Sequence, residues 1–107
     1  MSQLYVIKSS AVIIMNKTFP FSDAPNTACF TCRHVLEEHK PIVYVSHDED
    51  GYWQFLCGKS HNATDARIVS LSEILEIDSS MASFAKLDCG YYAELENAQS
   101  DWIIKQK

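Results

Sequence analysis

The chain has 107 residues, which is enough for one domain with a buried core. Hydrophobic residues make up 47% of it and charged residues 21%, as in ordinary globular proteins, and the low counts of three Gly and three Pro argue against disorder. The net charge is −5 and the basic residues are scattered, which argues against nucleic acid as a direct partner because phosphate binding needs a basic patch.

The first 26 residues are expected to form an N-terminal extension of a single domain over residues 1–107, with residues 27–107 as its core. Leu4–Ile7 and Val12–Met15 predict a weak hairpin, and the proline-containing segment 19–26 predicts a loop. The apolar run Ala11–Met15 is far too short to span a membrane, and no signal-peptide pattern is present. We therefore expect a cytoplasmic protein with no membrane partner and with its four cysteines reduced.

The segment after the loop predicts strands. Thr27–Cys32 is typical of a strand, whereas Arg33–His39 fits either a continuation of it or one turn of helix. Ile42–His47 and Tyr52–Cys57 predict a β-hairpin, because both are rich in β-branched or aromatic residues and Asp48–Gly51 supplies turn residues between them.

A hairpin loop of two or four residues fixes which side chains share a face. It places Tyr44 with Trp53 and Phe55, and Val45 with Leu56 on the other face. Both faces are then largely apolar, so we expect the hairpin to be central and covered on both sides. Tyr44, Trp53, Phe55 and Leu56 are expected to be largely buried.

The second half of the chain mixes short helices with strands. Arg67–Leu71 predicts a short strand, and Ser70 with Glu73 fits a capping box that starts a helix. A second helical turn over Met81–Leu87 follows, and two further strands are expected over Tyr91–Glu96 and Asp101–Lys107. These elements predict a single α+β domain with a mostly antiparallel sheet and one short helical segment.

Cysteines provide the main candidates for chemistry. Cys29 and Cys32, with Cys57 and His61, have the right ligand types for zinc. An offset of three in a regular strand would point the first two thiols to opposite faces, however, and no Gly or Pro shapes a knuckle there. A redox pair would need Cys29 at the start of a helix. The alternative function is therefore a zinc-stabilised or redox-sensing small module using Cys29, Cys32 and Cys57, but we expect no metal and no cofactor.

The four histidines give no catalytic signature. A Cys–His enzyme would pair one of them with Cys32 or Cys57, but no local motif supports a pairing. His34 and His47 lie in strand-like contexts that indicate structural roles, whereas His39 and His61 lie in polar contexts that indicate solvation. We therefore expect no catalytic residues and a protein that is not an enzyme.

The turn of the central hairpin is strongly acidic. Asp48, Glu49 and Asp50, with Tyr52 beside them, lack the alternating frame of a calcium loop. Three adjacent acids instead create a local negative field that favours a basic protein partner. These four residues are the expected partner-binding site. A solvated turn that only promotes solubility is the alternative.

Several segments resemble a known family in their order along the chain. They include Cys32-Arg33-His34-Val35, Pro41-Ile42-Val43-Tyr44-Val45 and, most specifically, Trp53-Gln54-Phe55-Leu56-Cys57-Gly58. Ile68-Val69-Ser70-Leu71 and Gly90-Tyr91 follow in the same order. This pattern resembles an uncharacterised bacterial domain of unknown function, which is similar to an immunity-protein family of polymorphic toxin systems.

The resemblance implies a non-enzymatic binding protein whose partner is a cognate protein toxin. The relatives lack Tyr52 between the glycine and the tryptophan, and Lys59-Ser60-His61 replaces their acidic residues. The oligomeric state is not implied.

Overall fold

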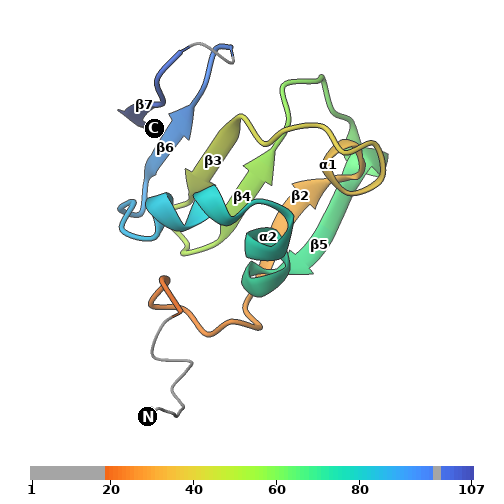
Figure 1. The fold of residues 1–107 in the computed structure, drawn as a ribbon. Coiled ribbons are helices and arrows are strands. Elements are labelled where there is room, and N and C mark those ends of the chain that lie inside the picture. Colours follow the sequence, from red (N-terminus) through yellow and green to blue (C-terminus); the bar gives the residue numbers. More distant parts are fainter. Residues whose placement is uncertain (1–18, 98–99) are drawn as a thin grey trace, which may run out of the picture.

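The fold is built on one β-sheet, seen in a computed structural model that describes residues 19–97 and 100–107. The hairpin expected from Leu4–Ile7 and Val12–Met15 lies outside these residues. The described strands are β2 (Ala28–Cys32), β3 (Tyr44–His47), β4 (Trp53–Leu56), β5 (Ala66–Ser70), β6 (Tyr91–Glu94) and β7 (Ile103–Gln106). They form a six-stranded sheet in the order β5-β2-β4-β3-β6-β7 (Figure 1).

The sheet is mixed, but antiparallel pairing dominates it. β2 and β4 run parallel, and the other described pairs of neighbours are antiparallel. Short helices complete the domain: α1 (Arg33–Glu37), α2 (Leu71–Ile77) and the 3₁₀ segments η2 (Ala63–Asp65) and η3 (Ser79–Phe84). The expected α+β class with a mostly antiparallel sheet is therefore confirmed.

Local capping explains where the helices begin. The Ser70 side chain accepts a hydrogen bond from the Glu73 N–H, and the Glu73 carboxylate accepts one from the Ser70 N–H, which confirms the expected capping box of α2. The Asp78 side chain accepts from the Ser80 N–H and caps η3. The segment that the sequence left undecided becomes α1, which follows β2 without a loop.

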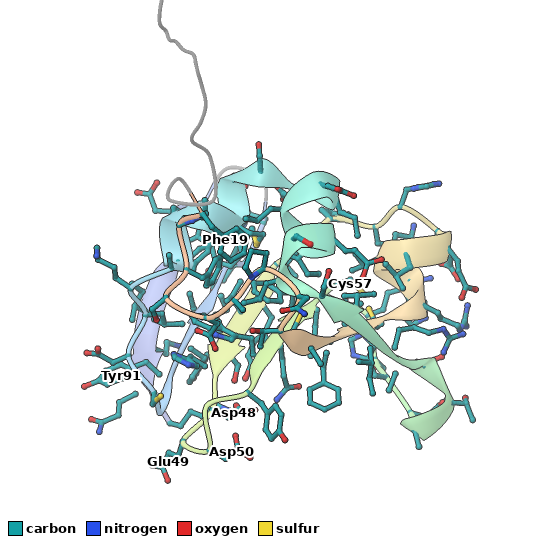
Figure 2. The ribbon with its side chains drawn as sticks, turned by 90° about the horizontal axis from the view of Figure 1, so that it is seen from below. Phe19, Asp48, Glu49, Asp50, Cys57 and Tyr91 are labelled. Carbon is teal, nitrogen blue, oxygen red and sulfur yellow. The ribbon has the colours of Figure 1, made fainter. Side chains whose placement is uncertain are left out.

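The helical segment lies over one face of the sheet. In Figure 1, α2 and η3 cross in front of the strands, and Figure 2 shows them stacked on one side of the sheet only. The core lies between these layers and includes Trp53, Phe55, Leu71, Ile74 and Met81, all fully buried. Residues 19–26 form a loop, as expected, but Phe21 from this loop is also buried in the core.

The register of the central hairpin differs from the expected one. His47 pairs with Trp53 and Tyr44 with Leu56, so five residues, Asp48–Tyr52, separate the paired strands. The Asp48 N–H donates to the Tyr52 carbonyl at 2.8 Å, and Gly51 adopts a φ of 93° that closes the turn. An odd loop length reverses the pairing parity of a two- or four-residue loop. The predicted face assignment was therefore wrong.

The corrected register decides which side chains lie on the side of the sheet away from α2 and η3. Val45 and His47 share the helix-covered face with Trp53 and Phe55, whereas Tyr44 and Leu56 lie on the opposite face. We call this opposite side the open face. Trp53 and Phe55 are buried as expected, but Tyr44 and Leu56 are only partly buried. The expectation of a hairpin covered on both sides was wrong.

Candidate functional site

The acidic turn divides into a structural part and an exposed part. The Gln54 side-chain amide donates to Asp48 Oδ2 at 2.9 Å, while Ser46 Oγ and Lys107 Nζ donate to Asp48 Oδ1. Burial raises the pKa of Asp48, but the hydrogen bonds from Lys107, Ser46 and Gln54 and the charge of Lys107 outweigh burial and lower it. Asp48 is thus engaged within the fold.

Glu49 and Asp50 form the exposed end of this turn. Both are exposed, and Figure 2 shows them at the end of the hairpin, away from the layer of α2 and η3. Asp50 Oδ1 accepts a hydrogen bond from the Tyr52 N–H at 3.2 Å, which fixes the turn without burying the carboxylate. Of the three acids expected to contact a partner, these two present their charge to solvent.

Tyr52 connects the acidic turn to an apolar patch on the open face. Its side chain is 52% exposed and meets the ring of Phe30 edge-on, with ring centroids 5.9 Å apart. Phe30 pairs with Ile68 across β2 and β5, and Ile68 is 68% exposed. We call Phe30, Tyr52 and Ile68 the apolar patch. Tyr52 links this patch to the acidic turn, because its N–H donates to Asp50 and its ring contacts Phe30.

A groove crosses the open face beyond this patch. It has a volume of about 660 Å³, and its lining includes Tyr44, Leu56, Lys59, His61 and Glu94. A smaller cavity of about 190 Å³ adjoins it and shares Gln54, Leu56 and His61 with it. The open face is therefore hollowed, and the walls of the groove carry both apolar and charged side chains.

A second constellation lies where the parallel strands end. Phe30 of β2 pairs with Gln54 of β4, and because parallel strands end at the same edge of a sheet, Cys32 and Cys57 meet there. Their sulfur atoms are 3.6 Å apart. His34 comes from α1 and His61 from the loop after β4, and the four potential ligand atoms all lie within 4.8 Å of one another. We call these four residues the Cys/His cluster.

The surroundings of the cluster are mostly buried. Cys32, His34 and Cys57 are buried, whereas His61 is exposed and places its Nε2 atom 3.5 Å from Cys57 Sγ. The Lys59 N–H donates to Cys57 Sγ at 3.4 Å. Burial raises the pKa of the Cys57 thiol; the hydrogen bond from Lys59 opposes this rise, and the neighbouring Cys32 adds to it.

Cys29 lies apart from this cluster. It is 1% exposed, and burial, together with the nearby Glu73 carboxylate, raises the pKa of its thiol to about 12. Cys32, which belongs to the cluster, pairs with Ala66 of β5. Cys29 lies three residues earlier on β2, pairs with Val69 and faces the helix-covered side of the sheet. Sequence reasoning therefore named Cys32, Cys57 and His61 of the cluster but placed Cys29 where the structure has His34.

Cys89 and His47 make a further contact between a thiol and an imidazole. Cys89 Sγ is 3.5 Å from Nε2 and 3.9 Å from Nδ1 of His47. A sulfur on the lone-pair axis of Nε2 would lie much farther from Nδ1, so this sulfur rests against the ring rather than in line with an acceptor. His47 Nδ1 also lies 2.7 Å from the Leu87 carbonyl oxygen. This arrangement is packing, not the alignment of a nucleophile with its base.

No family model, curated protein or solved structure matches this chain. Its function is therefore inferred from the geometry of the sites described above. Within residues 19–97 and 100–107, no helix is both long and apolar enough to cross a membrane.

Proposed function

We propose that this chain is a non-enzymatic protein-binding domain, and that it acts in the bacterial cytoplasm as an immunity protein that occludes a cognate toxin. The observation that carries the proposal is the apolar patch beside the exposed acids. Tyr52 and Ile68 are 52% and 68% exposed on a sheet face that α2 and η3 leave uncovered. Contiguous exposed apolar surface beside polar residues is typical of protein interaction sites.

The charge of this edge favours a basic partner. Lys107 contacts Asp48, whereas Glu49 and Asp50 remain exposed, and the chain carries a net charge of −5. Negative charge around an apolar patch steers a basic surface into contact and mainly increases the association rate. Toxins that attack nucleic acid carry basic surfaces because they bind phosphates, so the sign of the charge fits a blocking role.

The test uses the product of a neighbouring gene as the candidate toxin. Cells that express that product should stop growing, and co-expression of this chain should restore growth. The double variant Tyr52→Ala with Ile68→Ser should lose protection and bind the toxin at least about tenfold more weakly, because exposed aromatic and aliphatic anchors dominate interface energies.

A matched control separates a lost contact from a lost fold. Ile77 is 45% exposed in α2, on the helical side of the sheet. Ile77→Ser should therefore leave protection and binding intact, with both variants keeping the circular dichroism spectrum of the parent. Protection by the Tyr52/Ile68 variant equal to that of the parent would exclude the apolar patch, and failure of the parent chain to bind would exclude this toxin as its partner.

A further inference from the structure

We propose that Cys32, His34, Cys57 and His61 form a structural zinc site. These residues lie at the opposite end of β4 from the acidic turn, so this site is separate from the proposed toxin contact. Two thiolates and two imidazoles are a ligand set that zinc favours, because this borderline-soft ion binds sulfur and nitrogen in tetrahedral geometry.

The spacing of the ligand atoms fits one tetrahedral ion. Zinc–sulfur bonds of about 2.3 Å and zinc–nitrogen bonds of about 2.0–2.1 Å imply tetrahedral edges of about 3.8 Å between sulfurs and about 3.6 Å between sulfur and nitrogen. The Cys32 and Cys57 sulfurs are 3.6 Å apart, and Cys57 Sγ is 3.5 Å from His61 Nε2. These two edges therefore agree with the size of a zinc coordination shell.

His34 supplies an independent argument. Its side chain is 4% exposed, and its buried Nδ1 atom has no hydrogen-bond partner among the described residues. An unpaired buried polar atom is unfavourable, so its presence calls for an explanation. The rings of His34 and His61 have centroids 5.3 Å apart, and a metal ion coordinated by His34 Nδ1 would give that atom its missing partner.

The groups around the sulfur atoms suit bound thiolates. The Lys59 N–H donates to Cys57 Sγ, an arrangement that stabilises negative charge on the sulfur. Two thiolates would cancel the charge of Zn²⁺, leaving a neutral unit in a mostly buried position. His34 takes the place of Cys29 in this set, so the opposite facing of Cys29 and Cys32 on their strand does not prevent the four ligands from meeting.

Four protein ligands leave no open coordination position, so the role of the ion is structural rather than catalytic. The ligands come from the end of β2, from α1 and from two points in the segment that follows β4. Zinc would therefore join the ends of the parallel strand pair to α1 and to the loop that carries His61. Because His61 lines both the groove and the adjoining cavity, the ion would also hold one wall of the open face in place.

The experiment loads the full chain with ZnCl₂ or CoCl₂ after reduction and removes excess metal. We expect about one zinc per chain by elemental analysis, and a cobalt form whose visible spectrum shows tetrahedral d–d bands and thiolate-to-cobalt charge transfer. Cys57→Ser should remove the stoichiometric zinc. His61→Ala, a change at an exposed residue, should fold and should weaken zinc binding by at least about tenfold, since even second-shell losses cost that much.

Cys89→Ser and His39→Ala are the matched controls, because both residues are exposed and lie outside the cluster. Both should keep one zinc per chain and the cobalt spectrum of the parent. The proposal is overturned if the folded parent takes up no stoichiometric metal, or if Cys57→Ser and His61→Ala bind zinc as tightly as these controls. A cobalt spectrum without thiolate charge transfer would overturn it as well.

Discussion

His47 lies flat against Trp53, with ring centroids 3.8 Å apart and planes 10° from parallel. The ring of Phe21 lies nearly perpendicular to the same indole, with ring centroids 4.9 Å apart. The ring of Phe55 lies nearly parallel to it, with ring centroids 6.0 Å apart. Trp53 therefore connects β3, β4 and the loop formed by residues 19–26. It is 1% exposed, which makes it the largest fully buried side chain in the described core.

Trp53→Ala should destabilise the domain by about 3–5 kcal/mol, because it removes a large buried side chain and leaves a cavity among three rings. Urea denaturation followed by circular dichroism measures the free energy of unfolding. Tyr52→Ala is the matched control. Tyr52 is the aromatic residue next to Trp53 and is 52% exposed, so its substitution should cost under about 1 kcal/mol. Equal losses in the two variants would contradict the assignment of Trp53 as the core anchor.

Gly51 gives a second prediction, which concerns backbone conformation alone. Its φ is 93°, and an added Cβ would meet no atom within 4 Å. Gly51→Ala should therefore cost about 1 kcal/mol or more through strain at positive φ rather than through a clash. Gly58 has no positive φ, and its Cβ would lie 3.4 Å from Val43 Cγ2, an ordinary contact. Gly58→Ala should be nearly neutral in the same assay, and an equally neutral Gly51→Ala would argue against the five-residue turn.

The pKa of Asp48 predicts how stability depends on pH. Its folded pKa is lowered below the ordinary value of 3.8. The stabilisation from Asp48 is therefore complete above the unfolded pKa and is lost as pH falls through the lower folded pKa. Asp48→Asn should cost about 1 kcal/mol at neutral pH, and the gap between parent and variant should close in acid. Glu76→Gln, at an exposed position of α2, is the matched control and should cost under about 0.5 kcal/mol at neutral pH. A gap that persists unchanged below pH 3.8 would contradict the prediction.

Local sequence signals were sufficient for most elements of the fold. Ser70 and Glu73 fixed the start of α2, because the two partners of a capping box lie within one helical turn. Tyr52–Cys57 carried the aromatic content of a strand, and β4 lies within it. Loop length was not encoded as clearly. The acidic turn allowed several lengths, and adding one residue moved Tyr44 from the covered face to the open face.

The cluster could be predicted only in part, because its ligands meet through long-range pairing. Cys57 and His61 lie close in sequence, and both were named as possible ligands. His34 was missed because Arg33–His39 fitted a strand or a helix equally well, and only the start of α1 directly after Cys32 turns it toward Cys57. The parallel pairing of β2 with β4, which brings Cys32 and Cys57 together, leaves no local signal in either strand.

The last prediction concerns association with the proposed partner. Because Asp48 is held by Ser46, Gln54 and Lys107, neutralising it would perturb the fold as well as the charge. The double variant Glu49→Gln with Asp50→Asn avoids this problem, since both residues are exposed. We expect the association rate with a basic partner to fall several-fold at low salt and to depend less steeply on salt, while the dissociation rate changes little.

Stopped-flow or surface plasmon resonance kinetics over a range of salt concentrations measure both rates. Glu73 is unsuitable as a control because it caps α2, whereas Glu76 is exposed on the same helix without that contact. The control variant Glu76→Gln with Asp101→Asn removes the same formal charge away from the acidic turn, so it tests whether net charge alone matters. Slower association only in the Glu49/Asp50 variant would place the encounter at this turn. Equal slowing in both variants would assign the effect to net charge. No change in either variant would exclude the acidic turn from the binding surface, and the Tyr52 and Ile68 substitutions would then test the apolar patch alone.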